Sequence, residues 1–246
     1  MTWFRNWCVL ILFGSMAFTG LGQDRIQEAL KQFQEGQYDQ AAAIFEKIIL
    51  EESPSPDLYF NLGTCYLQSG RIGESRLAME KGLRLNPGHK KLLHQLALVK
   101  NRIDPQIEAL PSFMLLRWFA GLRDQWPSAR WGILLLVFIW LFSILVFLHR
   151  AGKWAAPAGL KYSLITLAAF TAILYFSRKH VEHRHYSILM EGGPLRIAPD
   201  ANSQVLLPLG AGSKSEVVDS LGTWYKVILE NNDQGWIEKS YLKRVE

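Results

Sequence analysis

Side chains that could carry out catalysis are scarce in this sequence. The chain has two cysteines, Cys8 and Cys65, and neither has a histidine at a spacing that indicates a nucleophile with its base. Phosphate-binding loops and zinc-protease motifs do not occur in it. Cys65 falls within a helical pattern, where a lone cysteine usually acts as a small buried hydrophobe. We therefore expect no catalytic residue, no cofactor and no enzyme activity.

Three histidines, His180, His183 and His185, are close together in RKHVEHRHYS. Such spacing could hold a metal ion, but the stretch is also basic and directly follows an apolar run. We interpret 177–185 as a basic linker beside a membrane, and we predict no bound metal.

Aromatic side chains near the C-terminus could instead bind a ligand. The segment TWYKVIL alternates, so Trp224 and Lys226 share one face of a strand and Tyr225 lies on the other. Because lysine prefers water, we expect Trp224 to be half-exposed in a groove, and Trp236 to be the main buried tryptophan. The expected core residues of this strand are Val227 and Leu229, and the predicted ligand-binding residues are Trp224, Tyr225 and Tyr241.

The element that must position these aromatics is a small all-β domain at 186–246. Short strands alternate there with Gly, Pro, Asn and Asp, and ENNDQG indicates a hairpin turn. The segment resembles a bacterial SH3-like domain in the pieces PLR with Pro199, LG with Gly212, WYKV, GWI and SYL. The resemblance implies a barrel that binds peptides or cell-wall material, which makes peptidoglycan a candidate partner.

A 34-residue repeat occupies the first part of the chain. A shift of 34 places residues 29–48 on 63–82, so that Gly36 meets Gly70 and Ala29 meets Gly63. Together with YFNLGTCYLQSG, this pattern resembles a tetratricopeptide repeat (TPR). It predicts an all-α domain over 23–110, with two helical hairpins and a capping helix. The resemblance implies a peptide-binding or assembly role, for which the concave-face candidates are Asn61, Gln68 and Arg71.

The middle of the chain is apolar enough to span a membrane twice. Trp131–Leu148 is uncharged, and Ala155–Phe176 contains only Lys161 near one end. We predict transmembrane helices at 131–148 and 155–176, joined by a cytoplasmic loop at 149–154. The preceding segment, 111–130, is apolar, aromatic and basic, and we expect it to lie in the membrane interface.

The N-terminus predicts export. Arg5 precedes the apolar stretch Trp7–Phe13, and small residues follow at Gly20 and Gly22. This pattern is typical of a signal peptide, 1–22, although an uncleaved anchor would give the same topology. Either way, the hairpin returns the chain to the side from which it entered. We expect a two-pass protein of the cytoplasmic membrane with both soluble domains on the periplasmic side.

The charge distribution argues against nucleic acid as a partner. The formal net charge is +5, but residues 113–185 alone carry 9 basic and 2 acidic side chains. Residues 186–246 carry 6 basic and 8 acidic side chains, and 23–112 carry 11 and 12. The excess therefore lies beside the apolar runs, where a lipid bilayer explains it.

The order of signal, TPR array, membrane hairpin and SH3-like domain resembles the BatE family of aerotolerance-operon membrane proteins. This resemblance implies envelope partners, namely von Willebrand A-type membrane proteins and a MoxR-type ATPase system, and a role in aerotolerance or envelope stress. Two functions remain open: an assembly scaffold that uses the TPR array, and a cell-wall sensor that uses the SH3-like domain.

Overall fold

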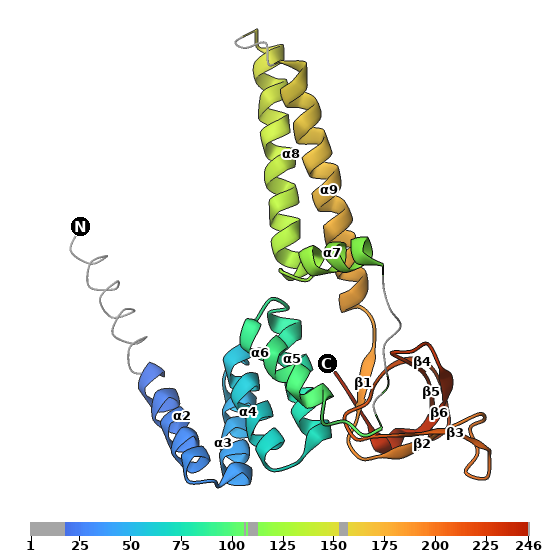
Figure 1. Cartoon of the computed structure of the whole chain (residues 1–246). Coiled ribbons are helices and arrows are strands. Elements are labelled where there is room, and N and C mark those ends of the chain that lie inside the picture. The colour runs from blue at the N-terminus through green and yellow to red at the C-terminus, as the bar shows by residue number, and fades with distance from the viewer. Residues whose placement is uncertain (1–17, 106, 108–112, 153–156, 246) are drawn as a thin grey trace.

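The computed structural model describes residues 18–105, 107, 113–152 and 157–245. It confirms the multidomain fold class: an α-helical repeat, a long helical hairpin and a small β-domain (Figure 1). The prediction of a signal peptide falls mostly on residues outside those described. The helices of the repeat are α2 (Phe18–Gln34), α3 (Tyr38–Glu51), α4 (Pro56–Gln68), α5 (Ile72–Leu85) and α6 (Lys90–Lys100).

The repeat is visible in how its helices end. Gly36 and Gly70 both have positive φ angles, 79° and 78°, which glycine adopts without steric cost. After Gly70 the Arg71 amide donates to the Tyr66 carbonyl at 2.8 Å, and after Gly36 the Gln37 amide donates to the Gln32 carbonyl at 2.9 Å. These bonds end α4 and α2 in the same way, and each turn starts the next helix.

Close packing within the second hairpin depends on Gly63. A Cβ atom at Gly63 would lie 2.6 Å from Met79 Cε and 3.2 Å from the Ser75 carbonyl oxygen. Ser75 Oγ donates to the Gly63 carbonyl at 2.7 Å, which joins α4 to α5 at the same point. The small residues Gly63 and Ser75 therefore allow α4 and α5 to approach each other closely.

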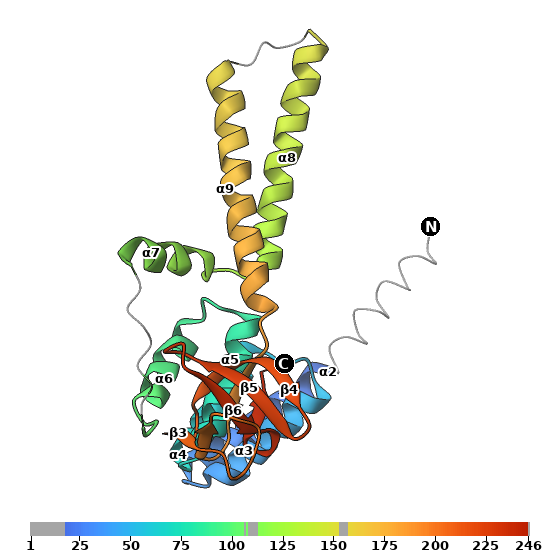
Figure 2. The same cartoon turned by 90° about the vertical axis from the view of Figure 1, so that its right-hand side faces the viewer.

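The hairpin consists of α8 (Ser128–Arg150) and α9 (Ala158–Glu182), both long and apolar enough to cross a membrane. Its buried residues include Trp131, Leu145 and Leu174, whereas Ile133 and Trp140 are among the apolar side chains that are more than 60% exposed. The short helix α7 (Met114–Arg123) lies across the foot of this hairpin (Figure 2).

The segment that we expected to be a basic linker differs from the prediction. The helix α9 continues through the apolar run to Glu182, so only the end of 177–185 is non-helical. The cause is local: Arg178 donates to Glu182 at 3.0 Å one turn later, and also to Asp124 at 3.0 Å. Arg178 is consequently buried rather than solvated.

The C-terminal domain is a seven-stranded antiparallel sheet that curls into a small barrel. The strand order is β3-β2-β6-β5-β4-β1-β7. Its interior is the buried apolar cluster Leu189, Leu195, Leu209, Val227, Leu229, Ile237 and Leu242. The strands are β1 (Tyr186–Leu189), β2 (Gly193–Arg196), β3 (Val205–Leu209), β4 (Lys214–Leu221), β5 (Trp224–Leu229), β6 (Gln234–Glu238) and β7 (Leu242–Arg244), with a 3-10 turn at Lys239–Tyr241.

Candidate functional site: the seam between the two soluble domains

The TPR helices and the β-barrel are docked against each other through charged side chains that sequence reasoning did not identify. We call this contact the seam, and define it by Arg76, Glu80, Lys100, Gly212, Lys214 and Glu230. Arg76 projects from α5 and is only 2% exposed. Its guanidinium donates to the Gly212 carbonyl at 2.8 Å and to the Glu230 carboxylate at 2.8 Å. A single α5 side chain therefore holds two loops of the barrel.

A second ion pair crosses the seam with the charges exchanged, so that the acid is on α5 and the base is on the barrel. Lys214 of β4 donates to Glu80 of α5 at 2.8 Å. Burial alone would raise the pKa of Glu80, but Lys214 and Arg76 outweigh it and hold this pKa below its usual value. Glu80 is therefore ionised in the docked state, and the seam depends on that charge.

Glycines allow the two backbones to approach closely enough for these pairs to form. A Cβ at Gly73 would lie 2.5 Å from the Leu189 carbonyl oxygen, and one at Gly210 would lie 2.3 Å from that of Asp104. Gly73, Arg76 and Glu80 are three or four residues apart, so they form one stripe along α5. This stripe of a small residue and two charges is the signal that could have revealed the seam.

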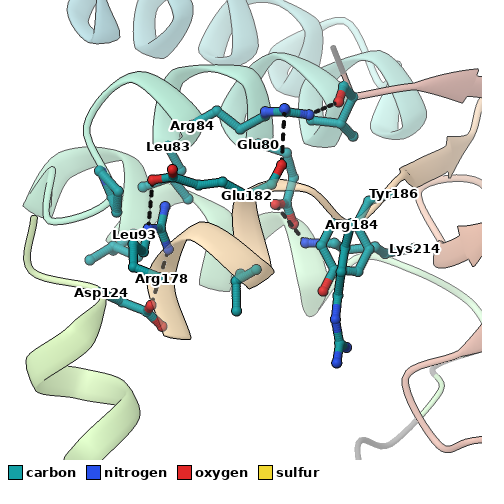
Figure 3. Close-up of a pocket in the computed structure, with 13 residues that line it drawn as sticks. Glu80, Leu83, Arg84, Leu93, Asp124, Arg178, Glu182, Arg184, Tyr186 and Lys214 are labelled. Atoms are coloured by element: carbon teal, nitrogen blue, oxygen red, sulfur yellow. Dashed lines mark hydrogen bonds and ion pairs between the residues drawn. The ribbon is translucent and has the colours of Figure 1, made fainter. Parts of the chain in front are cut away.

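The seam continues into a cavity of about 240 Å³ where the TPR helices, the barrel and the foot of the hairpin meet (Figure 3). Arg84 of α5 reaches the Val245 carbonyl and, at 3.4 Å, the Glu182 carbonyl. Arg178 faces the same cavity while it is bound to Asp124 and Glu182. The charged side chains around the cavity thus form ion pairs or bind backbone carbonyls, and these contacts join the domains to one another.

The predicted aromatic residues do not form one groove. Trp224 pairs with Glu238 and Lys226 pairs with Trp236, so both tryptophans lie on the outer face of the barrel. Trp224 is half-buried, as expected, and lines a cleft that also includes Pro199 and Lys239. The expectation that Trp236 is the main buried tryptophan is wrong, because Ile237 points inward in its place.

The two predicted tyrosines contact the barrel core, Tyr225 from the inner face of β5 and Tyr241 from the 3-10 turn. The Tyr225 hydroxyl accepts a hydrogen bond from Arg244 at 3.1 Å, and Lys239 lies 4.9 Å from its ring centroid. The Tyr241 ring lies against Gly193, where a Cβ would approach it at 3.1 Å. Tyr225 and Tyr241 therefore already have partners within the chain, whereas Trp224 lines the cleft beside Pro199 and Lys239.

Two of the three predicted TPR residues are available to a partner, and the third is bound to other side chains of the chain. Gln68 is exposed and Asn61 is half-buried, and both lie on the same side of α4. Arg71 donates to Glu74 at 2.8 Å and lies over the Tyr66 ring at 4.5 Å.

Sequence reasoning missed an apolar groove on the opposite side of α4. Its apolar lining includes Tyr59, Leu62, Ile49 and Leu77. Leu50 also lines it and is 85% exposed. The groove combines side chains from α3, α4 and α5 with Lys243 of β7, so it is formed by both soluble domains.

In the part of the chain that the structure describes, the reactive residue types do not converge. Cys65 is fully buried, as expected, and burial raises the pKa of its thiol to about 12, which disfavours the nucleophilic thiolate. Among the residues that the structure describes, no group of three or more His, Cys, Asp or Glu side chains could hold a metal ion. His180, His183 and His185 are all exposed.

Comparison with known proteins supports the identity of both soluble domains. Residues 32–98 match the family model of the tetratricopeptide repeat. Residues 191–243 match the family model of the bacterial SH3 domain. A search of curated proteins gave no match. The chain therefore contains a TPR region and a bacterial SH3 domain, both of which are typically interaction modules.

Proposed function

We propose that this protein is a non-enzymatic scaffold, anchored in the cytoplasmic membrane by α8 and α9, that assembles an envelope protein complex. The observation that carries the proposal is the seam. Two interaction modules are docked through buried ion pairs, so partners bound to them would be held in a fixed relative position. A catalyst would need converging reactive groups, whereas here the buried charges bind one another.

Membrane anchoring is supported by the surface of the hairpin. Side chains such as Ile133, Leu136 and Trp140 are more than 60% exposed along α8. Such a surface is unfavourable in water and favourable in hydrocarbon, and the length of each helix matches a bilayer. The N-terminal export pattern in the sequence supports a periplasmic location for both soluble domains. The domain order, which resembles that of BatE-type proteins, extends the proposal to von Willebrand A-type partners and to aerotolerance or envelope stress.

Site-specific photocross-linking tests the scaffold function. A photoreactive amino acid is placed at Gln68 on the predicted concave face, at Leu50 beside the apolar groove, and at the exposed Asp219 of β4 as a control. After irradiation of intact cells, adducts are identified by mass spectrometry. We expect defined membrane-protein adducts at Gln68 or Leu50 that are missing at Asp219. The same adduct profile at all three positions would argue against an assembly role.

A second candidate function is the recognition of peptidoglycan by the SH3 domain. The match to the bacterial SH3 family and the cleft beside the half-buried Trp224 favour it. Retention of the detergent-solubilised chain on purified sacculi is compared with that of Trp224→Ala. Equal retention of both proteins, or no retention of either, would remove this candidate and leave the scaffold.

A further inference from the structure

The helix α7 presents an unusually apolar surface to its surroundings. None of its ten residues is buried. The exposed apolar side chains of α7 and the residue before it are 59–82% accessible: Phe113, Met114, Leu115, Leu116 and Trp118. Exposed apolar residues that cluster in this way mark an interaction surface.

The position of α7 indicates what covers this surface. The helix lies crosswise at the foot of the hairpin, at the level where α8 and α9 meet the soluble domains (Figures 1 and 2). If α8 and α9 cross a bilayer, α7 lies at the plane of its surface. The exposed apolar residues of α8 begin at Ile133, just above this level, so the two apolar surfaces adjoin.

Direct contacts fix the orientation of α7. The Trp131 indole donates to the Arg123 carbonyl at 3.1 Å, which ties the end of α7 to α8. Asp124 accepts from Arg178 of α9 at 3.0 Å and from Arg123 at 2.7 Å. The Gln125 carbonyl lies close to Gly88 of the TPR domain, where a Cβ would approach it at 2.6 Å. The end of α7 thus touches the hairpin and the TPR domain at once.

The charge at this level suits phospholipid headgroups. Arg117, Arg130 and Lys179 are exposed, and α7 itself contains no acidic residue. The two acidic residues of 113–185, Asp124 and Glu182, are both paired with Arg178. Among the described residues of 113–185, the unpaired charge near the foot of the hairpin is therefore positive, and it would attract phosphate groups.

We propose that α7 lies in the headgroup region of the bilayer, on the same side as the two soluble domains, and acts as a brace that fixes their height and tilt. This inference rests on the proposed membrane anchoring. The apolar residues of α7 enter the boundary of the acyl chains, while Arg117, Arg130 and Lys179 bind lipid phosphates. Arg123 and Asp124 contact the hairpin, and Gln125 contacts the TPR domain. The depth of α7 in the membrane therefore also fixes the height of these two parts.

Fluorescence quenching in vesicles of phosphatidylcholine and phosphatidylglycerol tests the proposal. The full-length Cys8→Ala chain carries a bimane label at Trp118→Cys on α7, at Gln68→Cys as an exposed control on the TPR domain, or at Ile139→Cys within the hairpin. The buried Cys65 is retained, and the parent chain measures any background labelling. Each label is exposed to nitroxide-bearing lipids and, separately, to iodide in the buffer.

At position 118 we expect lipid nitroxides to quench at least about threefold more than at 68, and iodide to show the reverse preference. Equal quenching by iodide at 118 and 68 would overturn the proposal. Protection from both quenchers would also overturn it, because a protein surface would then cover α7. A label at 139 that lipid nitroxides do not reach would instead refute the membrane anchoring on which the inference rests.

The headgroup contact has its own matched pair of variants. Arg117→Glu should reduce lipid quenching at 118 in vesicles that contain phosphatidylglycerol, whereas Lys47→Glu on α3 should leave it unchanged. Both substitutions replace an exposed positive side chain by a negative one, so the two variants change the net charge equally. An equal effect of the two variants would refute the role of Arg117 in headgroup binding.

Discussion

The seam predicts that a substitution in the TPR domain destabilises the SH3 domain. Arg76→Met removes the guanidinium that joins α5 to Gly212 and Glu230, while it preserves most of the apolar volume of the side chain. The strands of the barrel lie far away in sequence, so any effect on them must pass through the docked interface. The amides of β5 are a suitable probe because they lie inside the sheet and outside the seam.

The size of the effect follows from the groups that lose their partner. A buried carbonyl without its donor costs about 1–3 kcal/mol, and this applies to Gly212. The Glu230 side chain is 29% exposed, so the loss of its ion pair is discounted to about 1 kcal/mol. Glu80 keeps Lys214 at 2.8 Å and adds little. The total is about 3 kcal/mol, which corresponds to about a hundredfold change in an equilibrium constant.

Hydrogen exchange of the full-length chain in a lipid nanodisc measures this change. Complete opening of the barrel includes its undocking, so the free energy that protects β5 contains the docking free energy. We expect the β5 amides of Arg76→Met to exchange about a hundredfold faster. The control Arg71→Met removes an exposed ion pair near the start of α5 and should change the rate less than about fivefold. Unchanged β5 exchange in Arg76→Met would show that the seam does not hold the domains together.

Four other outcomes follow from the structure. Folding lowers the pKa of Glu80 from its ordinary value of 4.5, so the stabilisation by its carboxylate is present above pH 4.5 and is lost as the pH falls through the lower, folded pKa. In chemical denaturation, the midpoint should therefore fall less steeply with acid for Glu80→Gln than for the parent chain. Gly63→Leu should overpack the contact with Met79, cost about 1–3 kcal/mol and lower the melting temperature, whereas Gln68→Leu on the same helix should not. Val227→Ala should destabilise the barrel by about 1–3 kcal/mol in chemical denaturation, and Trp224→Ala by less; the opposite order would contradict the facing of β5. Alkaline phosphatase fused after Asn101 or Glu246 should be active and, after Lys153, inactive; an inactive fusion at Asn101 would refute the periplasmic placement.

The sequence was sufficient to predict those features whose contacts are local in the chain or repeated along it. The 34-residue shift that aligns Gly36 with Gly70 correctly indicated two equivalent helix ends, since each depends on a glycine a few residues from its partners. The alternation in TWYKVIL correctly placed Val227 and Leu229 in the core, because pleating is a property of the strand itself.

The seam could not be predicted in the same way, because its contacts are far apart in sequence. Arg76 and Glu230 are separated by 154 positions, and neither lies in a repeating pattern that includes the other. A charged residue on a helix is normally solvated, so an isolated arginine indicates a surface position. Arg76 is buried only because the barrel supplies a carbonyl and a carboxylate at the correct place. That complementarity exists in the docked structure and not in either segment alone.

The error at Trp236 has a different origin and could have been avoided. Its large apolar area suggested a core position, but in GWI either the tryptophan or its two neighbours must face inward. A glycine within a strand often marks a close approach of another chain segment. At Gly235 a Cβ would lie 2.6 Å from Leu195 Cγ, so the inner face is the one that Gly235 and Ile237 share. The small barrel is filled by Leu195 at this point, and the tryptophan is consequently placed outside, on the face that carries Trp224 and the cleft beside it.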